Sequence, residues 1–182
     1  MSDPVTLRKT FTAFIDGLLS SPGRSLGNRS WSDRNSSTFR QIGQGAAVKS
    51  EARGAEAAAH TAAETLRAMG FEAEQRGKQV VIKSCPAWER VLDRGFEYAA
   101  QVQEVCWTPL LKGISERAGA MVRAVTSLSL ASMEKTELEY KLKRAKQDRD
   151  NGAISIAEYY KQRDALERSI AGLPKTGHYE FE

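Results

Sequence analysis

Two cysteines are the residues of this sequence whose type is best suited to chemistry. Cys85 stands directly before Pro86, and Cys106 follows 21 positions later. Thiolates act as nucleophiles and as ligands of soft metals, and the positive end of a helix lowers the pKa of a thiol placed there. Because Pro86 is typical of a first helical turn, Cys85 is the candidate catalytic residue. Cys85 and Cys106 together are candidate metal ligands, in a site that another chain or a cofactor would complete.

Aromatic side chains concentrate around the same cysteines and predict a pocket. Trp88, Phe96, Cys106 and Trp107 are the candidate residues for binding a flat apolar or metal-bearing ligand. The cofactor is unknown, and haem, a corrinoid, an iron–sulfur cluster and zinc all suit two soft sulfurs. Three interpretations of the cysteines stay open: small buried hydrophobes of the core, a ligand or metal site, and reversible thiol redox. No glycine-rich phosphate loop, serine nucleophile elbow or His-Glu metal motif is present in the sequence.

The composition describes one soluble globular domain with a small appendage. The chain has 182 residues, of which 41% are apolar and 27% charged, and 27 basic against 23 acidic residues give a net charge of +4. No segment concentrates the basic residues, so nucleic acid is not favoured as a partner. No apolar run approaches the ~20 residues of a membrane-spanning helix. Since the start carries no secretion signal, the two cysteines indicate reduced thiols and a cytoplasmic location.

The predicted domain, residues 1–132, begins with two helices and a long loop between them. Apolar spacing predicts a helix over 4–20. The polar stretch 21–45 is predicted to be a long loop, either solvated or with its arginines holding an anion. Small residues at spacings of three and four predict a helix over 46–69 that ends at Gly70.

A β-hairpin and a second helical region follow. Alternating apolar residues around an Arg-Gly-Lys turn predict the hairpin over 71–84. A helix is predicted over 86–106, and a Thr-Pro pair at 108–109 then predicts either a kink or a new helix to about residue 118. Alternation predicts a further strand over 121–130.

The C-terminal part of the chain predicts a different kind of structure. A charged stretch with thin apolar stripes, interrupted by an Asn-Gly turn, predicts a helical hairpin over 133–172, which must pack against something to be stable. Residues 173–182 are predicted to be either a disordered tail or an edge strand.

From Phe39 to Leu128 the order of motifs resembles a known family. It runs Phe39-Arg40-x-x-Gly43-x-Gly45, an Ala-rich helix to Met69-Gly70-Phe71, a hairpin, Val80-Val81-Ile82-Lys83-Ser84-Cys85-Pro86, a helix with Cys106, and Leu110-Leu111-x-Gly113. This order is similar to the 4-vinyl reductase domain family, whose fold is like that of the small subunits of the TRAPP transport-particle complex, and to the related aminothiazoline-carboxylate hydrolase-like proteins. The resemblance implies a ligand- or metal-binding domain. It also implies a partner strand directly after the strand at 121–130, which Tyr179 and Phe181 would supply here, with the helical hairpin inserted before it. Relatives carry further cysteines near the end of the domain, whereas this chain has none after Cys106.

Together these patterns predict an α+β fold, with an antiparallel sheet of about four strands covered by helices and a protruding C-terminal helical hairpin. The predicted function is that of a sensor, carrier or accessory subunit that binds a small apolar or metal-bearing ligand. A cysteine-dependent enzyme, like the hydrolase and reductase relatives, and a structural protein that docks through its hairpin are the alternatives. We expect a homo-oligomer or a partner protein bound through the hairpin, because the face at 46–69 and the hairpin stripes leave apolar surface uncovered.

Overall fold

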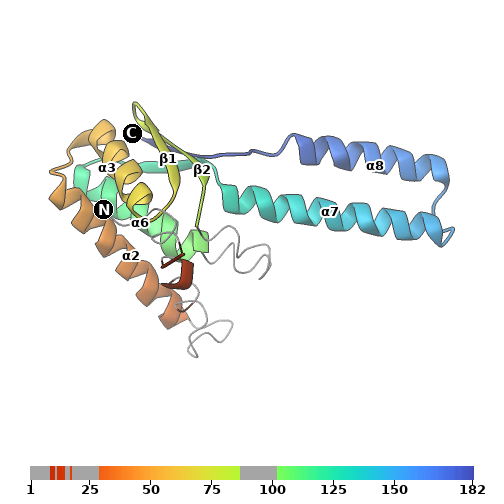
Figure 1. Ribbon diagram of the computed structural model, residues 1–182, viewed down its shortest axis with the longest axis horizontal. Helices are drawn as coiled ribbons and strands as arrows, with labels where there is room; N and C mark the ends of the chain where they lie inside the picture. Colours follow the sequence, from red (N-terminus) through yellow and green to blue (C-terminus); the bar gives the residue numbers. More distant parts are fainter. Residues whose placement is uncertain (1–8, 11, 15–16, 18–28, 87–101) are drawn as a thin grey trace.

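The computed structural model describes residues 9–10, 12–14, 17, 29–86 and 102–182. Figure 1 shows a body of helices and strands from which a long helical hairpin projects to one side. The strands form one antiparallel four-stranded sheet in the order β1-β2-β4-β3. The predicted α+β class is therefore confirmed. No helix among the described residues is long and apolar enough to cross a membrane.

The first two strands form the predicted β-hairpin. β1 (Glu72–Arg76) pairs antiparallel with β2 (Gln79–Ser84), and Gly77 in the turn has a φ of +58°. The apolar side chains of β2 are buried in the core, with Val80 fully inaccessible. The alternation in the sequence thus predicts the strand and its core-facing residues Val80 and Ile82, but not the burial of Val81 on the opposite face.

The last strand, β4 (Gly177–Phe181), lies inside the sheet. It pairs with β3 (Val122–Thr126), as predicted from Tyr179 and Phe181, and also with β2 on its other side. The prediction of an edge strand is therefore wrong, and β3 is the edge. The reason is that Tyr179 and Phe181 face the core, while both backbone edges of β4 find a partner strand.

The strand predicted over 121–130 is shorter than expected. β3 ends at Thr126, and helix α7 (Leu128–Asp150) begins two residues later. Ser127 makes the transition in an extended conformation, with φ −125° and ψ 129°, as an N-cap residue does. The chain from Leu128 onward therefore continues as a helix, because the pairing of β3 with β4 ends at Thr126 and His178.

Helix α2 (Arg29–Lys49) corrects the prediction of a long loop over 21–45 from residue 29 onward, and residues 21–28 lie outside the described residues. Its polar sequence has weak helix propensity, but Phe39, Gly43 and Ala47 recur every fourth residue and are buried against α6 (Thr108–Ala118). A Cβ atom on Gly43 would lie 2.1 Å from the Leu110 carbonyl oxygen. Reciprocally, a Cβ atom on Gly113 would lie 2.0 Å from a backbone oxygen of α2. The two glycines allow a close backbone approach that stabilises α2.

The helix predicted over 46–69 is divided in two. α2 ends at Lys49, and α3 (Gly54–Ala68) begins after a four-residue turn at 50–53. α3 buries small residues against the sheet and α6, as its spacing predicts. It ends before Gly70, whose φ of +85° confirms the predicted helix stop.

A π-helix, η1 (Val102–Trp107), leads directly into α6 without a break. The Thr-Pro pair thus marks a change from π-helix to α-helix rather than a break between two helices. The Thr108 hydroxyl oxygen accepts a hydrogen bond from the Gln103 side-chain amide at 3.0 Å. Of the helix predicted over 86–106, residues 87–101 lie outside the described residues. Of the helix predicted over 4–20, the described residues are helical.

The predicted helical hairpin is confirmed. It consists of α7 and α8 (Ile156–Ala171), which pack against each other. The Glu158 amide donates a hydrogen bond to the Ser155 hydroxyl oxygen at 3.1 Å and so caps α8. The hairpin lies between β3 and β4 in the chain and projects away from the body (Figure 1).

Candidate functional site

The structure brings three of the predicted site residues together. Cys85 follows the end of β2, and Cys106 and Trp107 lie on η1; all three are buried. Trp88 and Phe96 lie outside the described residues. The cysteines and Trp107 thus share one region of the core, between the end of the β-hairpin and the start of α6.

The cavity at this cysteine and aromatic cluster is small. Cys85, Gln103, Trp107 and Tyr179 are among the residues that line a cavity of about 10 Å³, and a space of this size holds about one water molecule. Trp107 packs edge-on against Phe71, with their ring centroids 4.8 Å apart. The described side chains therefore form a packed core here, and the binding of a larger ligand stays a prediction.

Gln103 of η1 organises a buried hydrogen-bond network beside the cysteines. Its side-chain oxygen accepts hydrogen bonds from the Ser127 hydroxyl at 2.9 Å and the Tyr179 hydroxyl at 3.1 Å. Its side-chain amide donates to the Thr108 hydroxyl oxygen at 3.0 Å. Because a buried polar group without a partner is costly, this network ties η1 to the sheet and to the start of α7.

The electrostatics of the cluster favour protonated groups. Burial raises the pKa of the Cys106 thiol well above its usual value near 9, and the nearby Cys85 raises it further. Burial also raises the pKa of the Tyr179 hydroxyl. Since the thiolate is the form that attacks carbon or binds metal, Cys106 is held in its unreactive form at neutral pH.

The metal prediction rests on the two cysteines alone. Among the described residues, no group of three or more histidine, cysteine or acidic side chains is placed to hold a metal ion. His60 Nδ1 lies 2.9 Å from the Gln75 side-chain oxygen, and His178 Nε2 lies 2.8 Å from the Thr176 hydroxyl. Neither histidine joins the cysteines, so metal binding by Cys85 and Cys106 stays a prediction.

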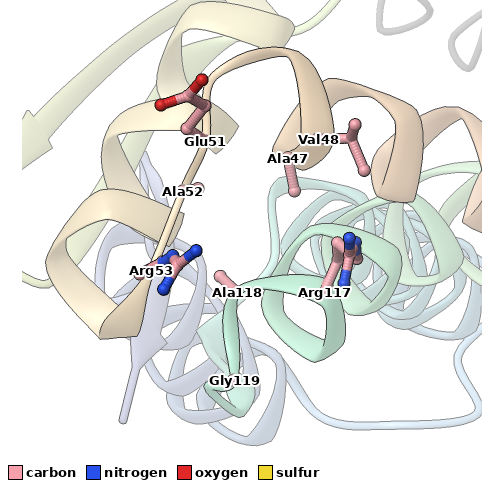
Figure 2. Close-up of a pocket in the computed structure, with 8 residues that line it drawn as sticks. All are labelled: Ala47, Val48, Glu51, Ala52, Arg53, Arg117, Ala118 and Gly119. Atoms are coloured by element: carbon pink, nitrogen blue, oxygen red, sulfur yellow. The ribbon is translucent and has the colours of Figure 1, made fainter.

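A second site, which the sequence analysis did not identify, lies where α2 and α6 end. It is an open cleft of about 620 Å³, lined by Ala47, Val48, Glu51, Ala52, Arg53, Arg117, Ala118 and Gly119. Figure 2 shows Arg53 and Arg117 on opposite sides of the cleft, with Ala118 between them and Glu51 directed away. We call it the arginine cleft.

The arginine cleft combines an apolar floor with two positive walls. Ala47, Ala52 and Ala118 are buried, whereas Arg53 and Arg117 are exposed. Within the described part of the chain, neither guanidinium has an acidic side chain as an ion-pair partner. Arg53 directly precedes α3, so the positive end of that helix adds to the same wall.

Glu51 at the rim of the arginine cleft has a conformation that usually belongs to glycine. At the end of α2, the Ala52 amide donates to the Ala47 carbonyl at 3.0 Å, and the Glu51 amide donates to the Val48 carbonyl at 3.2 Å. This is a Schellman motif, in which the residue at the left-handed position is usually glycine. The same pair of bonds ends α3, α6 and α7, where the left-handed residue is Gly70, Gly119 and Gly152. Glu51, with φ +52°, is the exception among these helices.

The fold and the two sites define an α+β protein with a packed cysteine cluster, a charged cleft and a projecting helical hairpin. No family model, curated protein or solved structure matches the chain. The function is therefore argued from the geometry of these sites.

Proposed function

We propose that this protein binds a small anionic molecule in the arginine cleft, as a sensor, carrier or accessory subunit. The observation that carries the proposal is the pair Arg53 and Arg117, which face each other across the cleft without an acidic ion-pair partner among the described residues. Two guanidinium groups are suited to a carboxylate or phosphate, because each offers paired N–H donors in a fixed plane. The ligand class is thus a small carboxylate or phosphate.

The size and lining of the arginine cleft support the same proposal. Its volume of about 620 Å³ falls within the usual range of small-molecule sites. The alanine floor offers an apolar surface for the body of the ligand. Glu51 directs its carboxylate away from the two arginines, and its left-handed backbone is the kind of local strain that proteins retain at functional sites.

Calorimetric titration with inorganic phosphate and with succinate, at fixed ionic strength, tests the proposal. We expect one site that binds at least one of the two probes. The probe with the higher affinity shows whether the site prefers phosphate or carboxylate. Replacing Arg53 or Arg117 with Gln should weaken binding by roughly 10- to 100-fold, because each change removes a charged hydrogen bond.

The matched control is Arg168→Gln, which removes the same charge from the exposed surface of α8, outside the arginine cleft. It should leave the affinity unchanged. If neither probe binds the wild-type chain, or if Arg168→Gln weakens binding as much as the cleft variants do, the proposal is wrong.

The cysteine and aromatic cluster is a second candidate ligand site of the same sensor, carrier or accessory subunit. In the 4-vinyl reductase family that the sequence resembles, the strand at 121–130 would be followed directly by its partner, and the pairing of β3 with β4 supports that resemblance. An apolar or metal-bearing ligand at Cys85 and Cys106, and a reducing cytoplasmic location for these thiols, are therefore kept as proposals. Metal analysis of the protein purified without oxygen, compared with a variant carrying Ser at both cysteines, tests the first of them.

A further inference from the structure

The helical hairpin has too little buried apolar surface for two long helices. Only Ala145 of α7 and Tyr159 of α8 are buried between the helices among the described hairpin residues from 134 to 171. The larger apolar side chains of the two stripes are only half-buried: Leu138, Leu142, Leu166 and Ile170. Since helix pairs in water depend on packing of an apolar face, the hairpin has an incomplete core.

A groove runs along this incomplete core. It has a volume of about 390 Å³ and lies between α7 and α8, lined by Lys141, Arg144, Ala145, Asp148, Gln162, Ala165 and Leu166. Figure 1 shows the hairpin standing clear of the body, so the body does not cover this groove. We call it the hairpin groove.

The charges of the hairpin groove are arranged to fit a second copy of the same groove. Lys141 and Asp148 lie seven residues apart on α7, so they point to the same side of the helix. A twofold axis across α7 between Arg144 and Ala145 would place Lys141 of each copy opposite Asp148 of the other. Asp148 has no ion-pair partner within the described part of the chain and is available for this contact. Lys141 pairs with Glu137 one turn earlier, at 2.6 Å, so in the dimer its ammonium group would lie between the Glu137 carboxylate of its own helix and Asp148 of the second copy.

We propose that two copies of this chain associate through the hairpin groove, with their α7 helices antiparallel, to form a four-helix bundle. The half-buried leucines and Ile170 then complete one shared core, as in other bundles made from two hairpins. Two Lys141–Asp148 pairs fix the register, because charged pairs beside an apolar seam select the alignment of helices. Ala145, which is buried at the floor of the hairpin groove, leaves room beside the axis for side chains of the second copy.

Charge reversal in the full-length chain tests this register. Lys141→Asp places two Asp–Asp pairs in the dimer, and Asp148→Lys places two Lys–Lys pairs there. Each variant alone should raise the dimer dissociation constant by roughly tenfold or more, measured by sedimentation equilibrium. An equimolar mixture of the two variants should form a heterodimer. In it, the introduced aspartate of one variant faces the introduced lysine of the other, and the unchanged Asp148 of the first faces the unchanged Lys141 of the second.

The control is Lys143→Asp, which makes the same charge change on α7 outside the hairpin groove. It also introduces a like-charge pair with Glu139 one turn earlier, as Lys141→Asp does with Glu137. Lys141→Asp in addition breaks the Lys141–Glu137 ion pair, and any loss of helix that this causes is measured separately. Circular dichroism of each variant checks that the helices remain. A wild-type chain that stays monomeric at about 100 μM, or a mixture that gains no heterodimer, overturns the proposal.

Discussion

Replacing Glu51 with glycine should stabilise the protein. Glu51 is the left-handed residue of the Schellman motif that ends α2, with φ +52°. A residue with a Cβ atom loses roughly 1–2 kcal/mol in this conformation, whereas glycine adopts it without cost. Glycine also adds roughly 0.5–1 kcal/mol of conformational entropy to the unfolded chain, which offsets part of the gain.

The net expected gain is therefore about 0.5–1 kcal/mol in the free energy of unfolding. Within the described residues, the Glu51 side chain makes no ion pair or hydrogen bond that its removal would break. For a chain of this length, such a gain raises the melting temperature by roughly 1–4 °C. Thermal unfolding followed by circular dichroism measures the shift.

Glu51→Ala is the matched control, because it removes the same carboxylate and keeps a Cβ atom in the left-handed conformation. It should leave the melting temperature close to that of the wild type. If Glu51→Gly melts at or below the temperature of Glu51→Ala, the backbone of Glu51 is not strained. The argument that this strain is retained for function at the arginine cleft would then fail.

Three further predictions follow from the packing and from the pKa shifts. Gly113→Ala should lower the free energy of unfolding by roughly 3 kcal/mol or more, because its Cβ would lie 2.0 Å from a backbone oxygen. Gly45→Ala, whose Cβ has no atom within 4 Å, should instead raise it by roughly 0.5–1 kcal/mol. Urea unfolding measures both changes. Because burial raises the folded-state pKa of Cys106 above 9, the unfolded chain loses this proton first. The free energy of unfolding should thus fall between about pH 9 and 10, and less steeply in Cys106→Ala. Gln103→Leu should lower the free energy of unfolding by roughly 2–4 kcal/mol, since it leaves two buried hydroxyls without their acceptor. Tyr179→Phe removes only one donor and should lower it by about 1 kcal/mol. Equal losses in the two variants would contradict the network.

The elements that the sequence predicts well are those with a strong local signal. The β-hairpin at 71–84 combines alternation with a glycine turn, and the helical hairpin combines an Asn-Gly turn with a Ser155 cap. The strand β4 was also predictable, because Tyr179 and Phe181 alternate with polar residues. In each case neighbouring residues carry the information, whereas the pairing of β4 with β3 was expected from the family resemblance.

The elements that the sequence predicts poorly depend on distant contacts. α2 has a polar sequence of weak helix propensity, and its helix depends on the close approach of Gly43 to α6. A buried residue every fourth position, from Phe39 through Gly43 to Ala47, was the available signal. The central place of β4 depends on its pairing with β2, about a hundred residues earlier, which no local pattern encodes.

The two candidate sites differ in the same way in how far the sequence predicts them. Cys85, Cys106 and Trp107 come together as the helix and strand pattern predicts, because they adjoin the ends of neighbouring elements. Arg53 and Arg117 lie 64 positions apart, and only the packing of α2 on α6 brings them to one cleft. No local sequence pattern around either arginine indicates that the other lies nearby.

The most direct test of anion binding in the arginine cleft is a nuclear magnetic resonance titration that follows the side-chain Nε–H signals of the arginines. Inorganic phosphate and succinate are added in separate titrations at constant ionic strength. We predict that the signals of Arg53 and Arg117 shift together along one binding curve, while that of Arg168 on α8 stays unchanged. Signals of all three arginines that move alike, or signals of Arg53 and Arg117 that do not move with either probe, would contradict the proposed function.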